Sequence, residues 1–422
     1  MTDKTKKALS YIKALVKWLI TAMIIGAVGG IVGSIFHICV DHVTELRTHN
    51  SYIIFLLPVG GVAIAALYLL AKGKGKIDTN RVIYGARGEG DVPLIMLPLI
   101  FVSTVITHFV GGSAGREGAA LQLGGSIGYN VGRAFRLKKE DMRILVMSGM
   151  SAVFAALFGT PLTAAVFALE VASVGSLCYG GLLPCMTAAI TGFQVSLMMG
   201  IPPVRIEGIA FPAFGAEQAL KVIVLALLCA FVGILFCTAI KKCEHYTEKL
   251  LPNKFAQAAV GGAIILILTL VLGTTDYNGA GMDVIVRAMG GEARPEAFLL
   301  KIIFTAITIA AGFKGGEIVP TFFIGATFGC FAGGILGLDP GFGAAVGFVA
   351  LFCSVVNCPL ASLLLSIEVF GGEGILFYAI VCSMSFMMSG YTSLYKSQRF
   401  VYSKLGSDCI NNCTNEEEDS DE

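Results

Sequence analysis

Two short glycine-rich segments place an acidic side chain at the start of an apolar run. Gly-Arg-Glu-Gly at 115–118 precedes the apolar residues 119–127, and Gly-Gly-Glu-Ile-Val-Pro at 315–320 precedes 321–328. Both are typical of helix N-termini, where backbone N–H groups lack an intrahelical partner and the helix dipole is positive. Two such ends that converge would bind an anion without a full positive charge. Close helix packing is the alternative use of these glycines, and we disfavour it because the motif recurs with an acid in each copy.

Four acidic residues in apolar surroundings are candidates for chemistry. Glu117 lies within an apolar segment, where an ionisable side chain indicates function. Its carboxylate would occupy the anion's place when charged and leave it when protonated, as a gate and a proton carrier; the alternative is a helix cap held by Arg116. Glu317 is equally well interpreted as a helix cap. Glu170 and Glu368 end two apolar helices, and we predict a shared structural role for them, such as an interhelical hydrogen bond.

The composition is that of a membrane protein. Of 422 residues, 55% are hydrophobic, 52 are glycine and 14% are charged, whereas about 25% are charged in soluble domains. The 30 basic and 29 acidic residues nearly cancel, which argues against nucleic-acid binding. The twelve cysteines contain no CxxC pair, so we expect no disulfide framework, no metal and no cofactor; a metal held by Cys409 and Cys413 is the disfavoured alternative.

The apolar blocks predict an all-α polytopic membrane protein. A lysine-rich start precedes an apolar stretch at 18–40, which exceeds the length of about 20 residues that crosses a bilayer. We expect its basic end to face the cytoplasm, and the stretch is too long for a signal peptide. Later blocks are interrupted by Gly or Pro, and several, such as 144–170 and 341–370, are too long for one span. Helices broken at membrane depth occur where the freed backbone lines a cavity or is buried in protein.

An internal repeat relates the two halves of the chain. Segment 152–171 matches 349–369 at an offset of 198, and segment 112–117 matches 312–317 at an offset of 200. The first pair shares a proline, a leucine, a glutamate and a valine. Interrupted helices at matching positions of two repeats point to a substrate site at their interface. The sequence alone leaves open whether the halves point in opposite directions.

The repeat also gives the domain boundaries. We expect a first membrane repeat at 1–205, a second at 206–405 and a disordered acidic tail at 406–422. A looser match joins 73–75 to 279–281.

These motifs resemble the CLC family of chloride channels and anion/proton exchangers, and the resemblance extends from about residue 72 to residue 395. The segment GREGA at 115–119 is similar to the family's GREGP, GGEIVP at 315–320 to its GGxFxP, and the tyrosine of GYTSLY to the family tyrosine that contacts the anion. The resemblance implies an inverted-repeat fold of about eighteen helices, in a homodimer with one pore per subunit. It makes Glu117 the gate and proton acceptor. It also implies an anion site formed by Gly115, Arg116, Gly118, Glu317, Ile318, Val319 and Tyr395.

Four departures from the family pattern bear on the ion and on proton coupling. No serine occurs near 73–77, Ile318 replaces an aromatic residue after Glu317, and Ala119 replaces a proline. Chloride/proton exchangers carry an inner acid where this chain has Val171, as the family's channels do. In lacking the serine and carrying GGExxP, the chain is similar to the fluoride-exporting branch of the family. That branch couples anion transport to protons without the inner acid. We therefore expect transport of a halide, chloride or fluoride, coupled to protons, with fluoride export favoured; a passive chloride channel is the alternative.

Two other classes of function were weighed. GGSAG at 111–115 satisfies GxSxG, but Ser113 would need an oriented histidine in an α/β fold, and only His108 is near in sequence. A cation transporter would need acids without converging amides. Neither is favoured, and we expect no enzyme. The expected partners are a halide, a proton, the lipid bilayer and a second copy of the chain, in a prokaryotic inner membrane with a cytoplasmic N-terminus.

Overall fold

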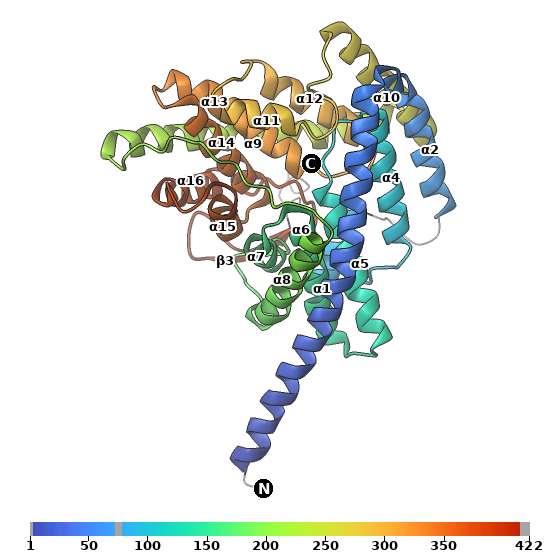
Figure 1. Ribbon diagram of the computed structural model, residues 1–422, viewed down its shortest axis with the longest axis vertical. Helices are drawn as coiled ribbons and strands as arrows, with labels where there is room; N and C mark the ends of the chain where they lie inside the picture. Colours follow the sequence, from blue (N-terminus) through green and yellow to red (C-terminus); the bar gives the residue numbers. More distant parts are fainter. Residues whose placement is uncertain (1–2, 72–77, 414–422) are drawn as a thin grey trace.

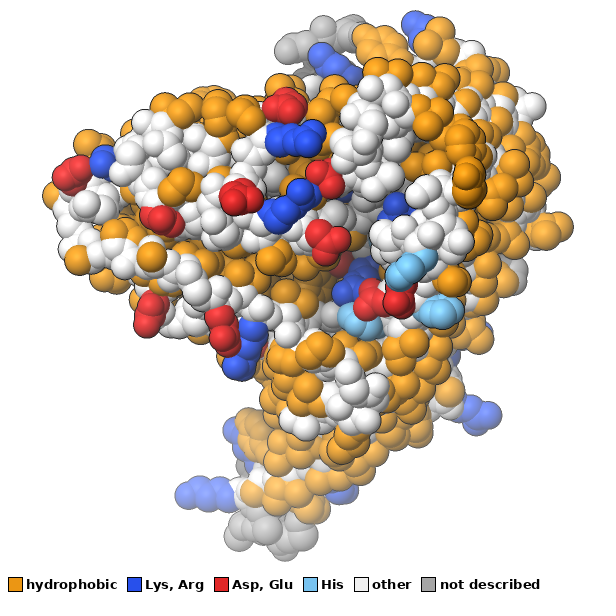
Figure 2. All heavy atoms as spheres, turned by 45° about the horizontal axis from the view of Figure 1, so that its top comes forward, with side chains coloured by type: hydrophobic (Ala, Val, Ile, Leu, Met, Phe, Trp, Pro, Cys, Tyr) orange, Lys and Arg blue, Asp and Glu red, His pale blue; other side chains and the backbone are white. Residues whose placement is uncertain are grey.

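The computed structural model describes residues 3–71 and 78–413 and is almost entirely helical (Figure 1). These residues form sixteen α-helices and two 3₁₀ helices, η1 (Ser51–Leu56) and η2 (Tyr179–Gly181). Seven of the described helical segments are long and apolar enough to cross a membrane, and shorter apolar helices of 10–17 residues accompany them. The prediction of an all-α polytopic protein is confirmed. Figure 2 shows hydrophobic side chains over the flanks of the molecule and charged and histidine side chains around a hollow.

The helices of the first half begin with a long N-terminal helix. This helix has 47 residues, so it continues well beyond the predicted apolar stretch, and its first turns extend past the other helices (Figure 1). The helices are α1 (Asp3–His49), α2 (Leu57–Leu70), α3 (Thr79–Arg87), α4 (Met96–Val110), α5 (Glu117–Ala134), α6 (Lys139–Phe158), α7 (Pro161–Glu170) and α8 (Leu182–Met198).

The second half repeats this order of long and broken helices. Its helices are α9 (Ala216–Leu250), α10 (Lys254–Leu272), α11 (Met282–Met289), α12 (Ala297–Ala310), α13 (Ile318–Ile335), α14 (Pro340–Val356), α15 (Pro359–Phe370) and α16 (Ile375–Met388).

The two longest predicted apolar blocks are each divided at a matching point. In the first, α6 ends before Gly159 (φ +69°) and α7 begins at Pro161. In the second, α14 ends before Asn357 (φ +55°) and α15 begins at Pro359. Proline is tolerated at the first position of a helix because its missing N–H would have no partner there. The repeated prolines therefore start a new helix in each half.

Reciprocal caps join these broken helices across the two repeats. The Glu170 carboxylate, at the end of α7, accepts hydrogen bonds from the backbone N–H groups of Leu360 (3.3 Å) and Ala361 (2.9 Å) at the start of α15. The Glu368 carboxylate does the same for the start of α7, accepting from the N–H groups of Leu162 (2.9 Å) and Thr163 (2.8 Å). The predicted interhelical role of both acids is confirmed.

Glycines bring the helices that follow the glycine-rich segments close to their neighbours. A Cβ on Gly124 of α5 would overlap the carbonyl oxygen of Gly149 in α6, and one on Gly325 of α13 would overlap that of Gly347 in α14. Backbone contact of this kind requires glycine on at least one of the two helices. The same close pair of helices therefore backs the candidate site in each repeat.

A small sheet near the C-terminus was not predicted. Its strands, in the order β1 (Ser173–Val174), β2 (Arg399–Tyr402) and β3 (Cys409–Cys413), pair in parallel and then antiparallel fashion. The segment expected to be disordered, 406–422, thus has its first part in an ordered strand, because β3 pairs with β2. Residues 414–422 of that tail and residues 73–75 of the looser repeat match lie outside the described residues.

Candidate functional site

The two glycine-rich segments meet in an antiparallel bridge. The Gly115 N–H donates to the Gly316 carbonyl (2.6 Å) and the Gly316 N–H donates to the Gly115 carbonyl (2.7 Å). A Cβ on Gly316 would overlap the backbone nitrogen of Gly118, so a side chain at this position is excluded. Helices α5 and α13 begin directly after the bridge. The structure thus brings together the N-termini of α5 and α13, which come from the two halves of the chain.

Glu117 is the first residue of α5 and is fully buried. Its Oε2 accepts a hydrogen bond from the Arg116 N–H (2.9 Å), and the backbone amide of Val319 at the start of α13 lies near enough to act on the carboxylate. Its Oε1 has no hydrogen-bond partner among the described residues and lies 4.0 Å from Arg116 Nε. The carboxylate therefore lies between the N-terminal ends of two helices, and backbone amides at such ends can bind an anion.

Glu317 lies at the corresponding point of the second repeat, at the N-cap of α13, and is half-buried. Its Oε2 is turned toward α5, since a Cβ on Gly118 would lie 3.4 Å from it. Ile318 and Val319, the next two residues, are buried in the first turn of α13. Each acid thus faces the start of the other repeat's helix.

Tyr395 is buried with 2% of its surface exposed, and it lies within electrostatic range of both Glu117 and Glu317. All of the predicted site residues are therefore near one junction: Gly115, Arg116, Glu117, Gly118, Glu317, Ile318, Val319 and Tyr395.

An ion-pair chain connects the Glu117 side of the junction to α1. Arg116 Nη1 contacts Asp41 Oδ1 at 2.7 Å, and His37 Nε2 contacts Asp41 Oδ2 at 2.9 Å. The Asp41 side chain is 57% exposed, whereas those of Arg116 and His37 are 16% and 14% exposed. This series of ion pairs therefore leads from the buried Glu117 to the solvent-exposed carboxylate of Asp41. Sequence analysis missed it, although His37 and Asp41 stand out four residues apart at the end of an apolar stretch.

The Glu317 side of the junction has different charged neighbours. Glu317 lies within electrostatic range of three charged side chains, those of Lys314, Glu244 and Asp78. The Lys314 ammonium lies 4.6 Å from the centre of the Tyr68 ring, and Glu244 forms an ion pair with Lys396 (2.7 Å). The two acids are therefore under the electrostatic influence of separate groups of charges.

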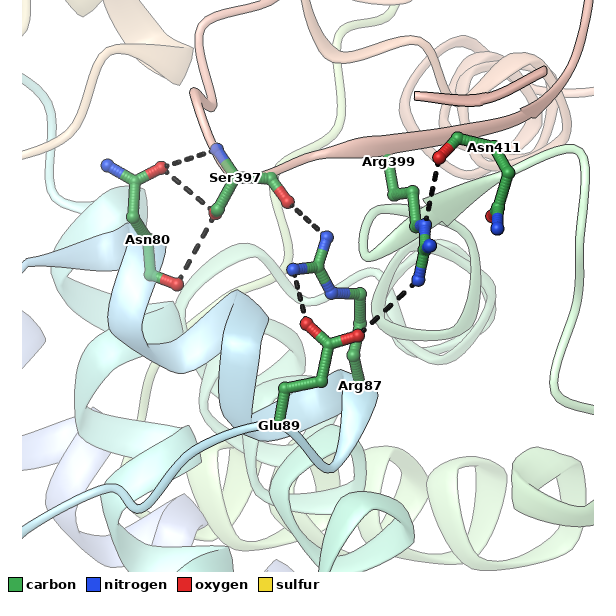
Figure 3. Close-up of polar contacts among 6 residues, drawn as sticks. All are labelled: Asn80, Arg87, Glu89, Ser397, Arg399 and Asn411. Atoms are coloured by element: carbon green, nitrogen blue, oxygen red, sulfur yellow. Dashed lines mark hydrogen bonds and ion pairs between the residues drawn. The ribbon is translucent and has the colours of Figure 1, made fainter. Parts of the chain in front are cut away.

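The segment that follows Tyr395 is anchored on α3 (Figure 3). Ser397 N–H donates to Asn80 Oδ1 (3.0 Å), and Arg87 donates to the Ser397 carbonyl (2.6 Å). Glu89 joins the anchor by pairing with Arg87 (2.6 Å) and with Arg399 (3.5 Å). These contacts fix the C-terminal side of the turn on which Tyr395 lies.

The geometry does not support the serine hydrolase alternative. Ser113 Oγ pairs with Thr305 Oγ1 (3.1 Å), and its backbone N–H donates to Thr308 Oγ1 (3.1 Å). His108 Nε2 is paired with the Gly115 carbonyl (3.2 Å) rather than with the serine. A nucleophilic serine requires a base in hydrogen-bond reach. Within 3–71 and 78–413, no group of three or more His, Cys, Asp or Glu side chains is arranged to hold a metal ion.

Comparison with known proteins gives consistent matches along most of the chain. The sequence model of a family described as voltage gated chloride channel matches residues 70–390. A chloride/fluoride channel protein of Pseudomonas syringae pv. tomato is 35% identical over 398 residues, which cover 92% of this chain and 88% of that protein. The H(+)/Cl(-) exchange transporter ClcA of Vibrio vulnificus is 26% identical, over 90% of this chain and 88% of its own length.

Two solved structures have a fold similar to that of this chain. The crystal structure of a CLC-type fluoride/proton antiporter has a TM-score of 0.88 and 30% identity, and the match covers 92% of this chain and 98% of the other. A slow cyanobacterial Cl-/H+ antiporter, with a TM-score of 0.75 and 20% identity over 88% of this chain and 94% of its own, shares the fold.

Proposed function

Because the chain belongs to the voltage-gated chloride channel family, as its resemblance to CLC proteins indicates, we propose that it moves a halide anion across the membrane through the junction of its two repeats. The observation that carries this proposal is the antiparallel bridge between Gly115 and Gly316, which brings the N-termini of α5 and α13 together. Backbone amides of helix N-termini bind anions and release them more readily than a fixed cation would.

The anion binds, in this proposal, where the Glu117 carboxylate now lies. The Arg116 amide donates to that carboxylate and the Val319 amide lies beside it, and both would bind a halide there. The surrounding residues Gly115, Gly118, Glu317, Ile318 and Tyr395 complete the site. Arg116 contributes its amide, since its guanidinium is paired with Asp41.

Glu117 is the gate and the proton acceptor on its side of the junction. A protonated Glu117 has less affinity for the amides, so it withdraws and admits an anion; an ionised Glu117 returns and blocks the site. Proton binding and anion binding are then linked through one group. Because Val171 carries no proton, the proton must pass the other side of the junction through Glu317, through water or by an inward movement of Glu117 itself. We favour Glu317 as the acceptor there, since it has its own charged neighbours.

The halide is fluoride in the favoured form of the proposal. The relative that shares 35% of its sequence is named a chloride/fluoride channel protein, and the structure with a TM-score of 0.88 is a fluoride/proton antiporter. One observation favours the second candidate, a passive chloride channel: Val171 stands where chloride/proton exchangers of the family have an acid.

Proteoliposomes loaded with KF or KCl test the proposal. Valinomycin clamps the voltage, a halide electrode records efflux, and a pH electrode records the external solution. Fluoride efflux faster than chloride efflux, with alkalinisation outside the vesicles, is the expected result. Halide efflux without a pH change identifies the passive channel, and efflux no faster than from protein-free vesicles refutes both forms.

We further propose a homodimer with one pore per subunit, in a prokaryotic inner membrane with the N-terminus in the cytoplasm. The dimer follows from the family resemblance, and the orientation follows from the basic residues that precede the first apolar stretch. Chemical crosslinking in detergent should give a band at twice the 44.4 kDa monomer mass. A monomer with full transport activity would contradict the dimer. A tag on the N-terminus should be reached by protease in inside-out vesicles only.

A further inference from the structure

A buried polar network holds the turn on which Tyr395 lies, and Gln398 is its centre. The Gln398 side chain is fully buried. Its Nε2 donates to the carbonyls of Val171 (2.9 Å) and Val356 (2.8 Å). Its Oε1 accepts from Asn357 Nδ2 (3.2 Å) and Ser393 Oγ (2.7 Å). A side-chain amide has two N–H donors and two acceptor lone pairs, so Gln398 uses its whole hydrogen-bonding capacity here.

Asn357 extends the network to the C-terminal end of α16. It is fully buried in a left-handed conformation (φ +55°), which Asn tolerates better than most residues. Its Nδ2 also donates to the Thr392 carbonyl (2.9 Å), and its Oδ1 accepts from Lys404 Nζ (2.5 Å) and Ser389 Oγ (3.3 Å). Both amides in the network are therefore satisfied, which makes it rigid rather than costly.

The network ends on the backbone of Tyr395. The Tyr395 N–H donates to Ser393 Oγ (3.1 Å), which in turn donates to Gln398 Oε1, and the Gln398 N–H donates to the Tyr395 carbonyl (3.1 Å). Both backbone polar groups of the tyrosine are thus held by this one glutamine, directly or through one serine. The contacts of Figure 3 fix the two residues next to Gln398 in the chain, Ser397 and Arg399.

The two carbonyls that Gln398 binds belong to different repeats. Val171 follows α7 directly, and Val356 is the last residue of α14. Carbonyls at helix C-termini have no intrahelical partner and need one from elsewhere. One side chain therefore joins the C-terminal ends of α7 and α14 to the turn that carries Tyr395.

We propose that Gln398 is a positioning residue of the anion site, which sets the place of Tyr395 relative to both repeats. The inference rests on the proposed function, in which Tyr395 contacts the anion. Gln398 thereby affects the affinity of the site for the anion, although it is not one of the residues that form the site.

The test is Gln398→Met, which keeps the side-chain length and removes all four hydrogen bonds. Gln257→Met in α10 is the matched control: Gln257 is 2% exposed, and its Nε2 has no partner among the described residues. We expect KM for halide efflux from proteoliposomes to rise about tenfold in Gln398→Met, as for the loss of one hydrogen bond to a charged ligand. We expect kcat within about twofold of the unmodified protein, and no change in Gln257→Met.

A double-mutant cycle separates positioning from a general loss of structure. In a Tyr395→Phe background, Gln398→Met should have no further effect on KM, because the hydroxyl that it misplaces is gone. If the two effects multiply, or if KM is unchanged in Gln398→Met, the inference is overturned and the proposed function stands. If Tyr395→Phe alone leaves KM unchanged, the assignment of Tyr395 to the anion site fails first. Ser393→Ala, which removes only the link to the Tyr395 N–H, should give a smaller rise in KM and serves if Gln398→Met does not fold.

Discussion

Replacement of Glu117 by glutamine should increase anion affinity and uncouple anion from proton movement. In the structure the ionised side chain accepts a hydrogen bond from the Arg116 amide and lies beside the Val319 amide. A hydrogen bond to a charged group contributes about 1.5–3 kcal/mol and a neutral one about 0.5–1.5 kcal/mol. The bond from the Arg116 amide therefore holds the carboxylate with about 1.5–3 kcal/mol, and the neutral side chain of glutamine with about 0.5–1.5 kcal/mol.

The difference of about 1–1.5 kcal/mol is the advantage that the anion gains over the competing side chain in Glu117→Gln, and it corresponds to about 5- to 12-fold in affinity. Isothermal titration calorimetry of the detergent-solubilised protein with fluoride and with chloride measures this change in anion affinity directly. A pH electrode on proteoliposomes should record halide efflux by Glu117→Gln without proton movement. Glu45→Gln, the same substitution at an exposed acid of α1, should behave as the unmodified protein. An affinity change below about threefold, or proton coupling that survives in Glu117→Gln, would show that Glu117 is only a helix cap.

Three further predictions concern Glu317, Gly316 and Glu170. Glu317→Gln should lower proton movement at least tenfold while halide efflux continues, as recorded in the same vesicles; unchanged coupling would exclude Glu317 as the second acceptor. Gly316→Ala should reduce halide efflux more than tenfold, because its methyl group would overlap the backbone nitrogen of Gly118, whereas Gly372→Ala, which has open space around it, should not. Glu170→Ala should destabilise the protein by about 1–3 kcal/mol, since the start of α15 loses its cap. Thermal unfolding in detergent measures the effect of Glu170→Ala, with Glu373→Ala at an exposed acid as the control. Equal melting temperatures of the two variants would contradict the structural role of Glu170.

The repeat made much of the fold predictable from the sequence. Matching prolines at 161 and 359 indicated where long apolar blocks break, and matching acids at 170 and 368 indicated a shared structural role. These inferences succeed because proline excludes a continuous helix and because a buried carboxylate must find hydrogen-bond donors. The sequence did not indicate which donors: each acid caps the helix of the other repeat, about 190 or 206 residues away.

Contacts between distant polar residues were not predictable. The ion pair of Arg116 with Asp41 joins residues 75 apart, and Gln398 bonds to a carbonyl 227 residues away. Neither pair leaves a periodic pattern, because each involves single side chains whose partners are fixed by the packing of whole helices. The helical continuation of α1 through its lysine-rich start was also missed, since hydropathy identifies the apolar part of a helix and not its polar extension.

The two repeats differ at the position directly before each acid. Arg116 and Gly316 occupy equivalent positions before Glu117 and Glu317. The arginine gives its repeat a charge beside the gate, and Asp41 compensates that charge from α1. A second arginine at 316 would need space that the backbone of Gly118 already fills, so the other repeat supplies close approach instead of charge. The symmetric fold thus brings two helix ends together, and the asymmetric pair of residues places a guanidinium beside one acid only: Arg116 Nε lies 4.0 Å from the Glu117 carboxylate, whereas the cation that acts on Glu317 is Lys314. Glu117 is fully buried and Glu317 is half-buried among a separate group of charges, so the proposed function gives the two acids different roles in the exchange of anion and proton.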